Sequence, residues 1–207
     1  LPAARTTHDI DLILRAEVVT DANSMKPIRQ ALDNLNFEVV PSAKYMQFVR
    51  DIGTGQVKID LLAGPLGKFA DRVPSDSRRI KPQPSVKLHA RKLDEALAVE
   101  QYPIRIPISG TLPSGVMHKI DVLIPQAFTY LLTKLLAFRD RLGDTEKEFG
   151  RHHALDIYRI VGLLTREEDS HVRELSQEFA SHPVVTEVRQ IAEENFISED
   201  GIGRIRI

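Results

Sequence analysis

The chain has 207 residues, of which 42% are hydrophobic and 28% are charged, a composition typical of folded globular proteins. Its formal charge of −1 gives no overall attraction for nucleic acid, so any contact with RNA would need a local basic patch. The absence of cysteine excludes disulfides, thiolate catalysis and cysteine-based zinc sites. No apolar run reaches the length of a transmembrane helix and no secretory signal pattern is visible, so we expect a cytoplasmic protein without a membrane partner.

Polar and apolar residues alternate over residues 7–14, which predicts a β-strand. Asp9 and Asp11 would share one face of this strand, because successive strand side chains point to opposite faces. The residues expected in the core on the other face are Ile10, Leu12 and Leu14. Two neighbouring carboxylates repel each other unless a cation neutralises them, and their oxygens suit Mg²⁺ or Mn²⁺. On its own, the pattern also fits a strand end with two solvated acids.

The following segments predict an α+β arrangement. A helix is expected over residues 24–36, then short strands over 37–41 and 44–50. A glycine-containing turn at 53–55 leads into a second alternating strand over 56–62, which completes a hairpin. The N-terminal half is therefore expected to form a small mixed sheet with helices.

The second alternating strand offers a third acid, because Lys58 and Asp60 share one of its faces. If it lies beside the first strand, Asp60 would join Asp9 and Asp11 around two cations. In-line attack on a nucleotide α-phosphate uses that arrangement. Asp121, in a second Lys-Ile-Asp segment, is a rival third acid. We favour Asp60, because strands close in sequence usually lie adjacent in a sheet.

Residues 64–92 are rich in proline, serine and basic residues, and we expect long loops there. These loops are either a flap over a substrate or a solvated surface, and their basic residues could guide RNA. The basic residues are Arg72, Arg78, Arg79, Lys81, Lys87 and Arg91. Segments 98–108 and 119–124 are expected to extend the sheet, and Pro103 and Pro107 keep the first of them at an edge.

From Gln126 onward the pattern is helical, with helices expected over 127–141, 146–164, 167–180 and 184–195. We therefore expect two domains, an α+β domain over 1–124 and a helical C-terminal domain over 125–207.

Two of these helices carry an isolated charge among apolar neighbours, Lys134 in the first and Asp156 in the second. A salt bridge from Asp156 to Lys134 or Arg139 would tie the two helices together. Each charge fits either a packing role or a functional one.

The order of four elements resembles the AbiEii-type nucleotidyltransferases of the polymerase β-like superfamily. These elements are Arg-Thr-Thr before the Asp-x-Asp strand, Lys-Ile-Asp, the Lys-Leu-Leu-Ala-Phe-Arg-Asp-Arg helix, and Leu-Asp-Ile-Tyr. The resemblance covers roughly residues 5–164. It implies a nucleotidyltransferase fold in which Asp9, Asp11 and Asp60 bind Mg²⁺ or Mn²⁺ and act in catalysis. It also implies that Lys134 and Asp156 border the pocket for an NTP.

Members of that family are often toxins paired with an antitoxin protein, and they carry a Gly-Gly or Gly-Ser pair shortly before the Asp-x-Asp strand. Residues 1–8 contain no glycine or serine. Either the pair lies upstream, which the leucine at the first position favours, or the phosphate cradle is lost and the protein is degenerate. Another departure is His153, where an aspartate is common. The expected activity is transfer of an NMP to a hydroxyl of RNA, protein or a small molecule. The alternatives are an inactive binding module of the same fold and a helical interaction domain.

Overall fold

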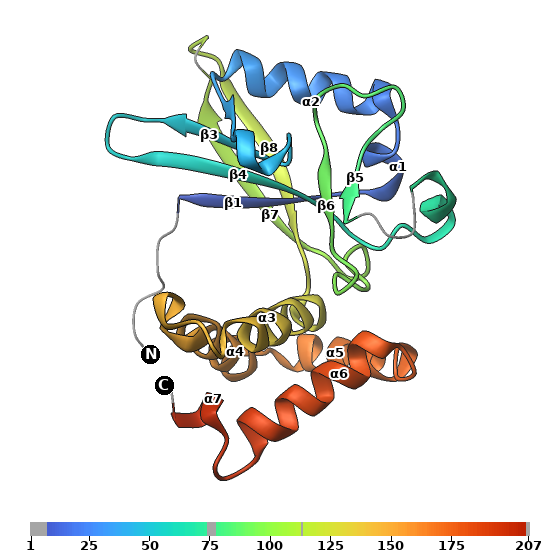
Figure 1. Cartoon of the computed structure of the whole chain (residues 1–207), viewed down its shortest axis with the longest axis vertical. Helices are drawn as coiled ribbons and strands as arrows, with labels where there is room; N and C mark the ends of the chain where they lie inside the picture. The colour runs from blue at the N-terminus through green and yellow to red at the C-terminus, as the bar shows by residue number, and fades with distance from the viewer. Residues whose placement is uncertain (1–7, 74–77, 113, 206–207) are drawn as a thin grey trace. The chain divides into compact units, whose positions relative to one another are not determined.

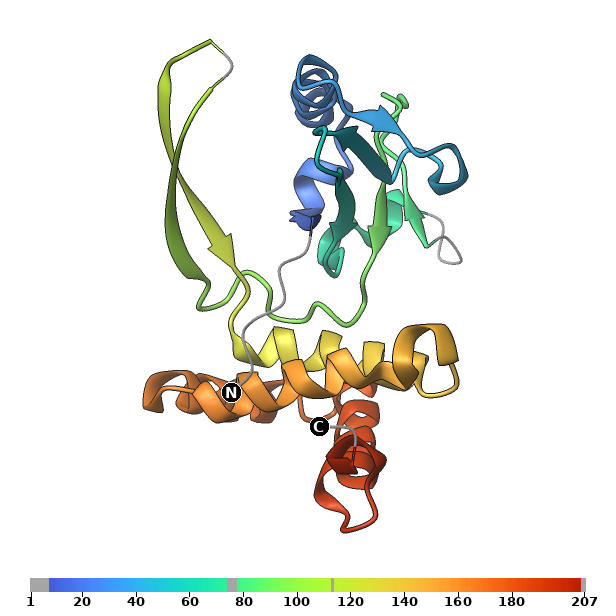
Figure 2. The same cartoon turned by 90° about the vertical axis from the view of Figure 1, so that its left-hand side faces the viewer.

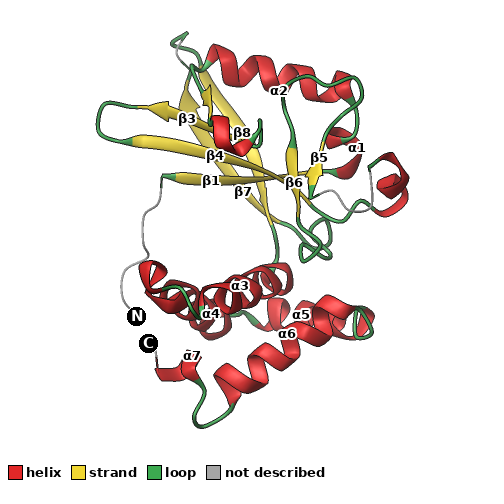
Figure 3. Ribbon diagram, viewed as in Figure 1, coloured by secondary structure: helices red, strands yellow, loops and turns green. Residues whose placement is uncertain are grey.

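The computed structural model describes residues 8–73, 78–112 and 114–205, so the Arg5-Thr6-Thr7 segment lies outside the described residues. The fold is mixed α+β with small sheets (Figure 3). The chain divides into two compact units, Leu1–Asp94 and Glu95–Ile207. The division falls well before the boundary expected after Ile124. The hairpin that ends at Ile124 belongs to the second unit, because within the described residues its two strands pair only with each other.

The first unit contains one mixed sheet with helices (Figure 1). The strand order is β2-β3-β4-β6-β5, and β1 pairs in parallel with the other edge of β4. Its helices and strands are β1 (Asp9–Leu14), α1 (Ala16–Val19), α2 (Ala22–Asn34), β2 (Glu38–Val39), β3 (Gln47–Asp51), β4 (Gln56–Ala63), β5 (Arg79–Ile80) and β6 (Ala90–Lys92). The expected loop region therefore contributes two short strands, β5 and β6, to the sheet.

The core of the first unit lies on the sheet face that carries Phe48, Ile59 and Leu61, where α1 and α2 supply buried side chains. From β1 only Leu14 packs against this core. The expectation that Ile10 and Leu12 are core residues is wrong, since they are 45% and 39% exposed. The reason is the edge position of β1, which among the described strands pairs with β4 alone.

Helix α2 begins two residues earlier than expected. The side chain of Asp21 accepts hydrogen bonds from the backbone N–H of Ser24, at 2.8 Å, and from its hydroxyl, at 2.7 Å. An aspartate at this position satisfies a backbone donor that the helix itself leaves unpaired. Asp21 is therefore the N-cap, and the helix begins at Ala22 and not at residue 24.

The second unit consists of a β-hairpin followed by helices, and Figure 2 shows the hairpin as a long twisted ribbon. The expectation that these two strands extend the first sheet is wrong, because they form a separate antiparallel sheet. The elements of this unit are β7 (Ile104–Thr111), β8 (Met117–Ile124), α3 (Ala127–Arg141), α4 (Arg151–Leu163), α5 (Arg166–Glu178), α6 (Pro183–Ala192) and α7 (Ile202–Ile205).

The helices of the second unit share a core of their own, built mainly from α3, α4, α5 and α6. Phe138 and Leu175 are fully buried in it. Helix α3 spans the residues that the sequence predicts, and the predicted helix over 146–164 is shorter, because a 3₁₀ segment over Thr145–Gly150 precedes α4. No helix in the described ranges is both long and apolar enough to span a lipid bilayer.

Candidate functional site

The two strands that carry the acids lie side by side, as the sequence predicts. In the parallel pairing of β1 with β4, Asp11 is opposite Asp60 and Asp9 is opposite Lys58. Paired residues of neighbouring strands point to the same face of a sheet, so all four side chains belong to one face. This is the face away from the core cluster. We call it the polar face and define it by Asp9, Asp11, Gln47, Lys58, Asp60 and Arg91.

Asp121, the rival third acid, lies on β8 in the separate two-stranded sheet of the second unit. Its carboxylate accepts a hydrogen bond from Arg105 of β7 at 3.2 Å. Of the two candidates for the third acid, Asp60 is therefore the one on a strand that pairs with β1.

Lys58 lies between two of the three acids. Its Nζ atom is 3.6 Å from Oδ1 of Asp9 and 3.4 Å from Oδ2 of Asp60. The ammonium group thus neutralises part of the carboxylate charge that the sequence assigned to a metal ion. The alternation of β4 placed Lys58 on this face, but only the register with β1 shows that it faces Asp9.

The residues present fit a divalent cation in their chemistry. Oδ1 of Asp60 is buried and has no hydrogen-bond partner among the described residues, and the side chain as a whole is only 17% exposed. A buried, unpaired carboxylate oxygen is costly unless a donor or a cation reaches it. Within residues 8–73, 78–112 and 114–205, however, no three acidic or histidine side chains converge around a single point. Metal binding would therefore require the acids to shift and Lys58 to move aside.

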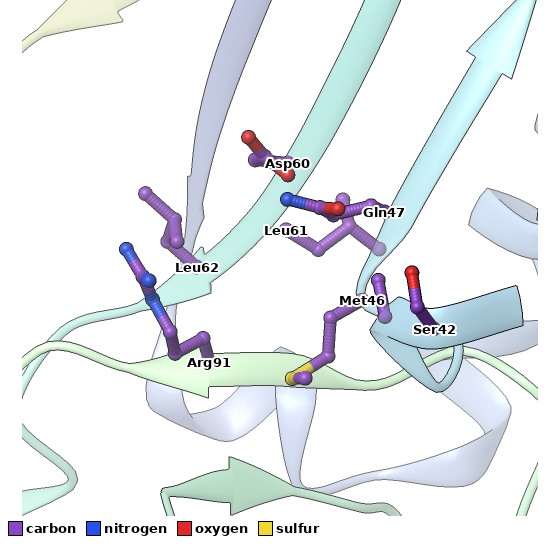
Figure 4. Close-up of a pocket in the computed structure, with 8 residues that line it drawn as sticks. Ser42, Met46, Gln47, Asp60, Leu61, Leu62 and Arg91 are labelled. Carbon is purple, nitrogen blue, oxygen red and sulfur yellow. The ribbon is translucent and has the colours of Figure 1, made fainter. Parts of the chain in front are cut away.

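A hollow of about 280 Å³ opens beside Asp60 (Figure 4). Gln47 of β3, which is opposite Asp60 in the register, lines it, and so does Arg91 of β6. Neither side chain has a hydrogen bond or ion pair to another described residue. The sequence reasoning gave no role to Gln47 and placed Arg91 in a loop, because no local pattern shows that these segments border Asp60.

Lys134 and Asp156 form the ion pair that the sequence predicts between α3 and α4. Nζ of Lys134 donates to Oδ2 of Asp156 at 2.7 Å, and both side chains are about one-third exposed. Arg159 lies 3.7 Å from the other carboxylate oxygen. Asp156 is thus held by two cations, and the pair joins the two helices.

His153, one turn before Asp156, adds a titratable group to this cluster. Its Nδ1 atom is buried without a hydrogen-bond partner among the described residues. Burial lowers the pKa of His153, and the positive charge of Lys134 lowers it further, whereas the negative charge of Asp156 raises it. The imidazole is therefore held mainly in its neutral form beside the ion pair.

The predicted residues thus form two groups. Asp9, Asp11 and Asp60 lie on the polar face of the first unit, and Lys134 and Asp156 lie in the second unit. Comparison of the chain with family models, with curated proteins and with solved structures finds no match.

Proposed function

We propose that this protein is a metal-dependent nucleotidyltransferase with a nucleotidyltransferase fold. The observation that carries the proposal is the pairing of Asp11 with Asp60 on adjacent parallel strands, together with the buried, unpaired Oδ1 atom of Asp60. The reaction moves an NMP from an NTP to an acceptor hydroxyl. A bond forms between the acceptor oxygen and the α-phosphorus, the bond from that phosphorus to pyrophosphate breaks, and the acceptor hydroxyl gives its proton to water.

Asp9, Asp11 and Asp60 would hold Mg²⁺ or Mn²⁺. When bound, such an ion neutralises phosphate charge and polarises the reacting oxygens. Lys58 would act as the counter-ion of these acids before the nucleotide arrives, since its ammonium lies between Asp9 and Asp60.

By the resemblance alone, Lys134 would bind a phosphate of the NTP as a point charge. Within the second unit, Asp156 accepts a hydrogen bond from that lysine. The acceptor is an RNA end, a protein or a small molecule. A toxin role, with an antitoxin protein as partner, follows from the resemblance alone.

The second candidate is a binding module of the same fold without catalytic activity. The observation that favours it is again Lys58, because a lysine that permanently neutralises Asp9 and Asp60 leaves less need for a metal ion. Such a module would still bind a nucleotide or a partner protein through the same face.

The test incubates the native full-length protein with each α-labelled NTP in Mg²⁺ or Mn²⁺, with total RNA, cell protein or buffer as acceptor. We expect label in one acceptor fraction with the wild type and none with the Asp9→Ala/Asp11→Ala double variant. The matched control is Asp121→Ala, which removes the acid of the other Lys-Ile-Asp segment and should leave transfer unchanged. A thermal melt of each variant separates loss of chemistry from loss of folding.

Transfer that survives in the double variant refutes the assignment of Asp9 and Asp11. If the wild type transfers no label and still shows saturable NTP binding, the binding module replaces the transferase as the preferred function.

A further inference from the structure

Two arginines lie side by side on the face of the sheet that carries Asp60, on the neighbouring strands β5 and β6. In the antiparallel pairing of β5 with β6, Arg79 is directly opposite Arg91. Directly paired residues point to the same face, with their Cβ atoms about 5 Å apart. Like charges in that position destabilise a sheet. The pairing therefore places two guanidinium groups next to each other on one face of the sheet.

Arg91 connects this pair to the acids. It is opposite Leu62 in the parallel pairing of β4 with β6, and Leu62 is two residues beyond Asp60 on the same face. Strand rise and strand spacing put the Cα atoms of Arg91 and Asp60 about 8 Å apart. The Arg91 side chain is exposed and lines the hollow, and within the described ranges it has no hydrogen bond or ion pair. Its five N–H donors are free to receive a ligand.

A buried histidine lies close to the arginine pair. His89, two residues before Arg91, is buried, and its Nδ1 lies 2.9 Å from the backbone carbonyl oxygen of Lys44. Burial lowers the pKa of His89, and the charges of Arg79 and Lys81 lower it further. Arg79 and Lys81 are therefore close enough to His89 to disfavour its charged form.

We propose that Arg79 and Arg91 form a binding site for a phosphate group, at the edge of the hollow that Asp60 lines. Planar guanidinium groups bind phosphate oxygens through paired hydrogen bonds, and two of them match the charge of a phosphate. The phosphate belongs either to the NTP or to a nucleic-acid acceptor. The role of the site in catalysis rests on the proposed function, but phosphate binding itself does not.

The test measures dissociation constants by calorimetry for Arg91→Gln and for a matched control, Lys92→Gln. Lys92 is the next residue on β6, carries the same charge, points to the opposite face and pairs with Asp94 at 2.7 Å. We expect Arg91→Gln to weaken phosphate binding about tenfold, the size of one lost charge-assisted hydrogen-bonding group, and Lys92→Gln to change it less than about twofold. Arg91→Lys, which keeps the charge and loses the planar fork, should fall between the two.

Two probes distinguish the sources of the phosphate. One is ATP, and the other is a tetranucleotide with a free 3′ hydroxyl. If Arg91→Gln weakens the binding of ATP alone, the site binds a phosphate of the NTP. If it weakens the binding of the oligonucleotide alone, the site binds a phosphate of the acceptor. Either result supports the phosphate site, and so does weaker binding of both probes.

Equal weakening by Arg91→Gln and Lys92→Gln, or no weakening by either, overturns the proposal. The measurements are repeated in EDTA with the Asp9→Asn/Asp11→Asn variant, which should retain Arg91-dependent binding. Binding that depends on Arg91 in a protein that never transfers label would leave the phosphate site in place and refute only the transferase activity.

Discussion

Asp11 and Asp60 are directly opposite each other on the adjacent parallel strands β1 and β4. Two like charges in register on one face of a sheet are unfavourable, and a nearby cation favours their ionised forms. Lys58 provides one cation within 4 Å of Asp60, and it leaves Oδ1 of that residue without a partner among the described residues. A hydrogen-bond donor or a cation at Oδ1 of Asp60 would therefore stabilise this site.

Replacing Asp60 should remove the response of the protein to divalent cations. At a Mg²⁺ concentration about 100 times the dissociation constant, a bound ion stabilises the wild type by about 2.7 kcal/mol, which is several degrees in Tm. We expect Asp60→Asn to abolish this shift, because it removes the buried carboxylate, and Asp121→Asn to retain it. Thermal melts with Mg²⁺ and with EDTA measure both. A shift of the same size in Asp60→Asn would mean that the ion binds elsewhere.

Replacing Lys58 with methionine should make the first unit more dependent on Mg²⁺. Without divalent ions, the loss of two partly exposed ion pairs should lower the free energy of unfolding by about 1 kcal/mol. With Mg²⁺ the difference from wild type should close, because the ion no longer competes with an ammonium group. Lys119→Met, in the corresponding position of β8, is the control. If Mg²⁺ does not change the free energy of unfolding of Lys58→Met, the result favours the inactive binding module.

The ion pair between α3 and α4 should be visible in the titration of His153. Lys134 lowers the pKa of His153 and Asp156 raises it, so the two partners act with opposite sign. We therefore expect the pKa of His153 to rise in Lys134→Met and to fall in Asp156→Asn, as measured by NMR on the ring protons. Shifts in the same direction in both variants would contradict the geometry.

The strands and helices that sequence predicts well here are those with a long local pattern. The alternation of six to eight residues in β1 and β4 fixes which side chains share a face, and helix α3 follows its apolar periodicity over fifteen residues. The adjacency of β1 and β4 could be predicted from their closeness in sequence. Strand β6, by contrast, has three residues, too few to show alternation.

The parts that sequence did not predict depend on pairing between distant segments. Gln47 and Arg91 border Asp60 only because β3 and β6 pair with successive parts of β4. The sequence predicts that β7 and β8 join the first sheet, whereas they pair with each other. An alternating strand pattern does not specify which strand will be its partner. The role of Lys58 was missed for the same reason, because its approach to Asp9 is set by the register.

His89 is buried in the first unit, and the stability of the fold should therefore depend on the protonation of this residue. Nδ1 of His89 faces a carbonyl oxygen, so this nitrogen must carry the hydrogen and donate. Nε2 lies 3.4 Å from the hydroxyl of Ser85. Burial and neighbouring positive charges lower the pKa of His89 in the folded protein below its ordinary value of 6.5.

In the unfolded chain, the same histidine gains a proton as the pH falls below about 6.5, while the folded protein resists protonation. The stability that His89 contributes is thus fully present above pH 6.5 and is lost as the pH falls toward the lowered pKa. The loss is at most about 1.4 kcal/mol for each pH unit. We expect His89→Asn, whose amide can still donate to the Lys44 carbonyl, to reduce this slope. His118→Asn, at an exposed position on β8, should leave it unchanged.

Chemical denaturation at a series of pH values between 5 and 8 measures the slope for all three proteins. Bound phosphate should also change the pKa of His89. An anion held by Arg79 and Arg91 would offset the positive charges that lower this pKa. Saturating ligand should therefore raise that pKa in the wild type and have no such effect in Arg91→Gln. An identical pH dependence in wild type and His89→Asn would show that His89 does not contribute to the acid sensitivity of the fold.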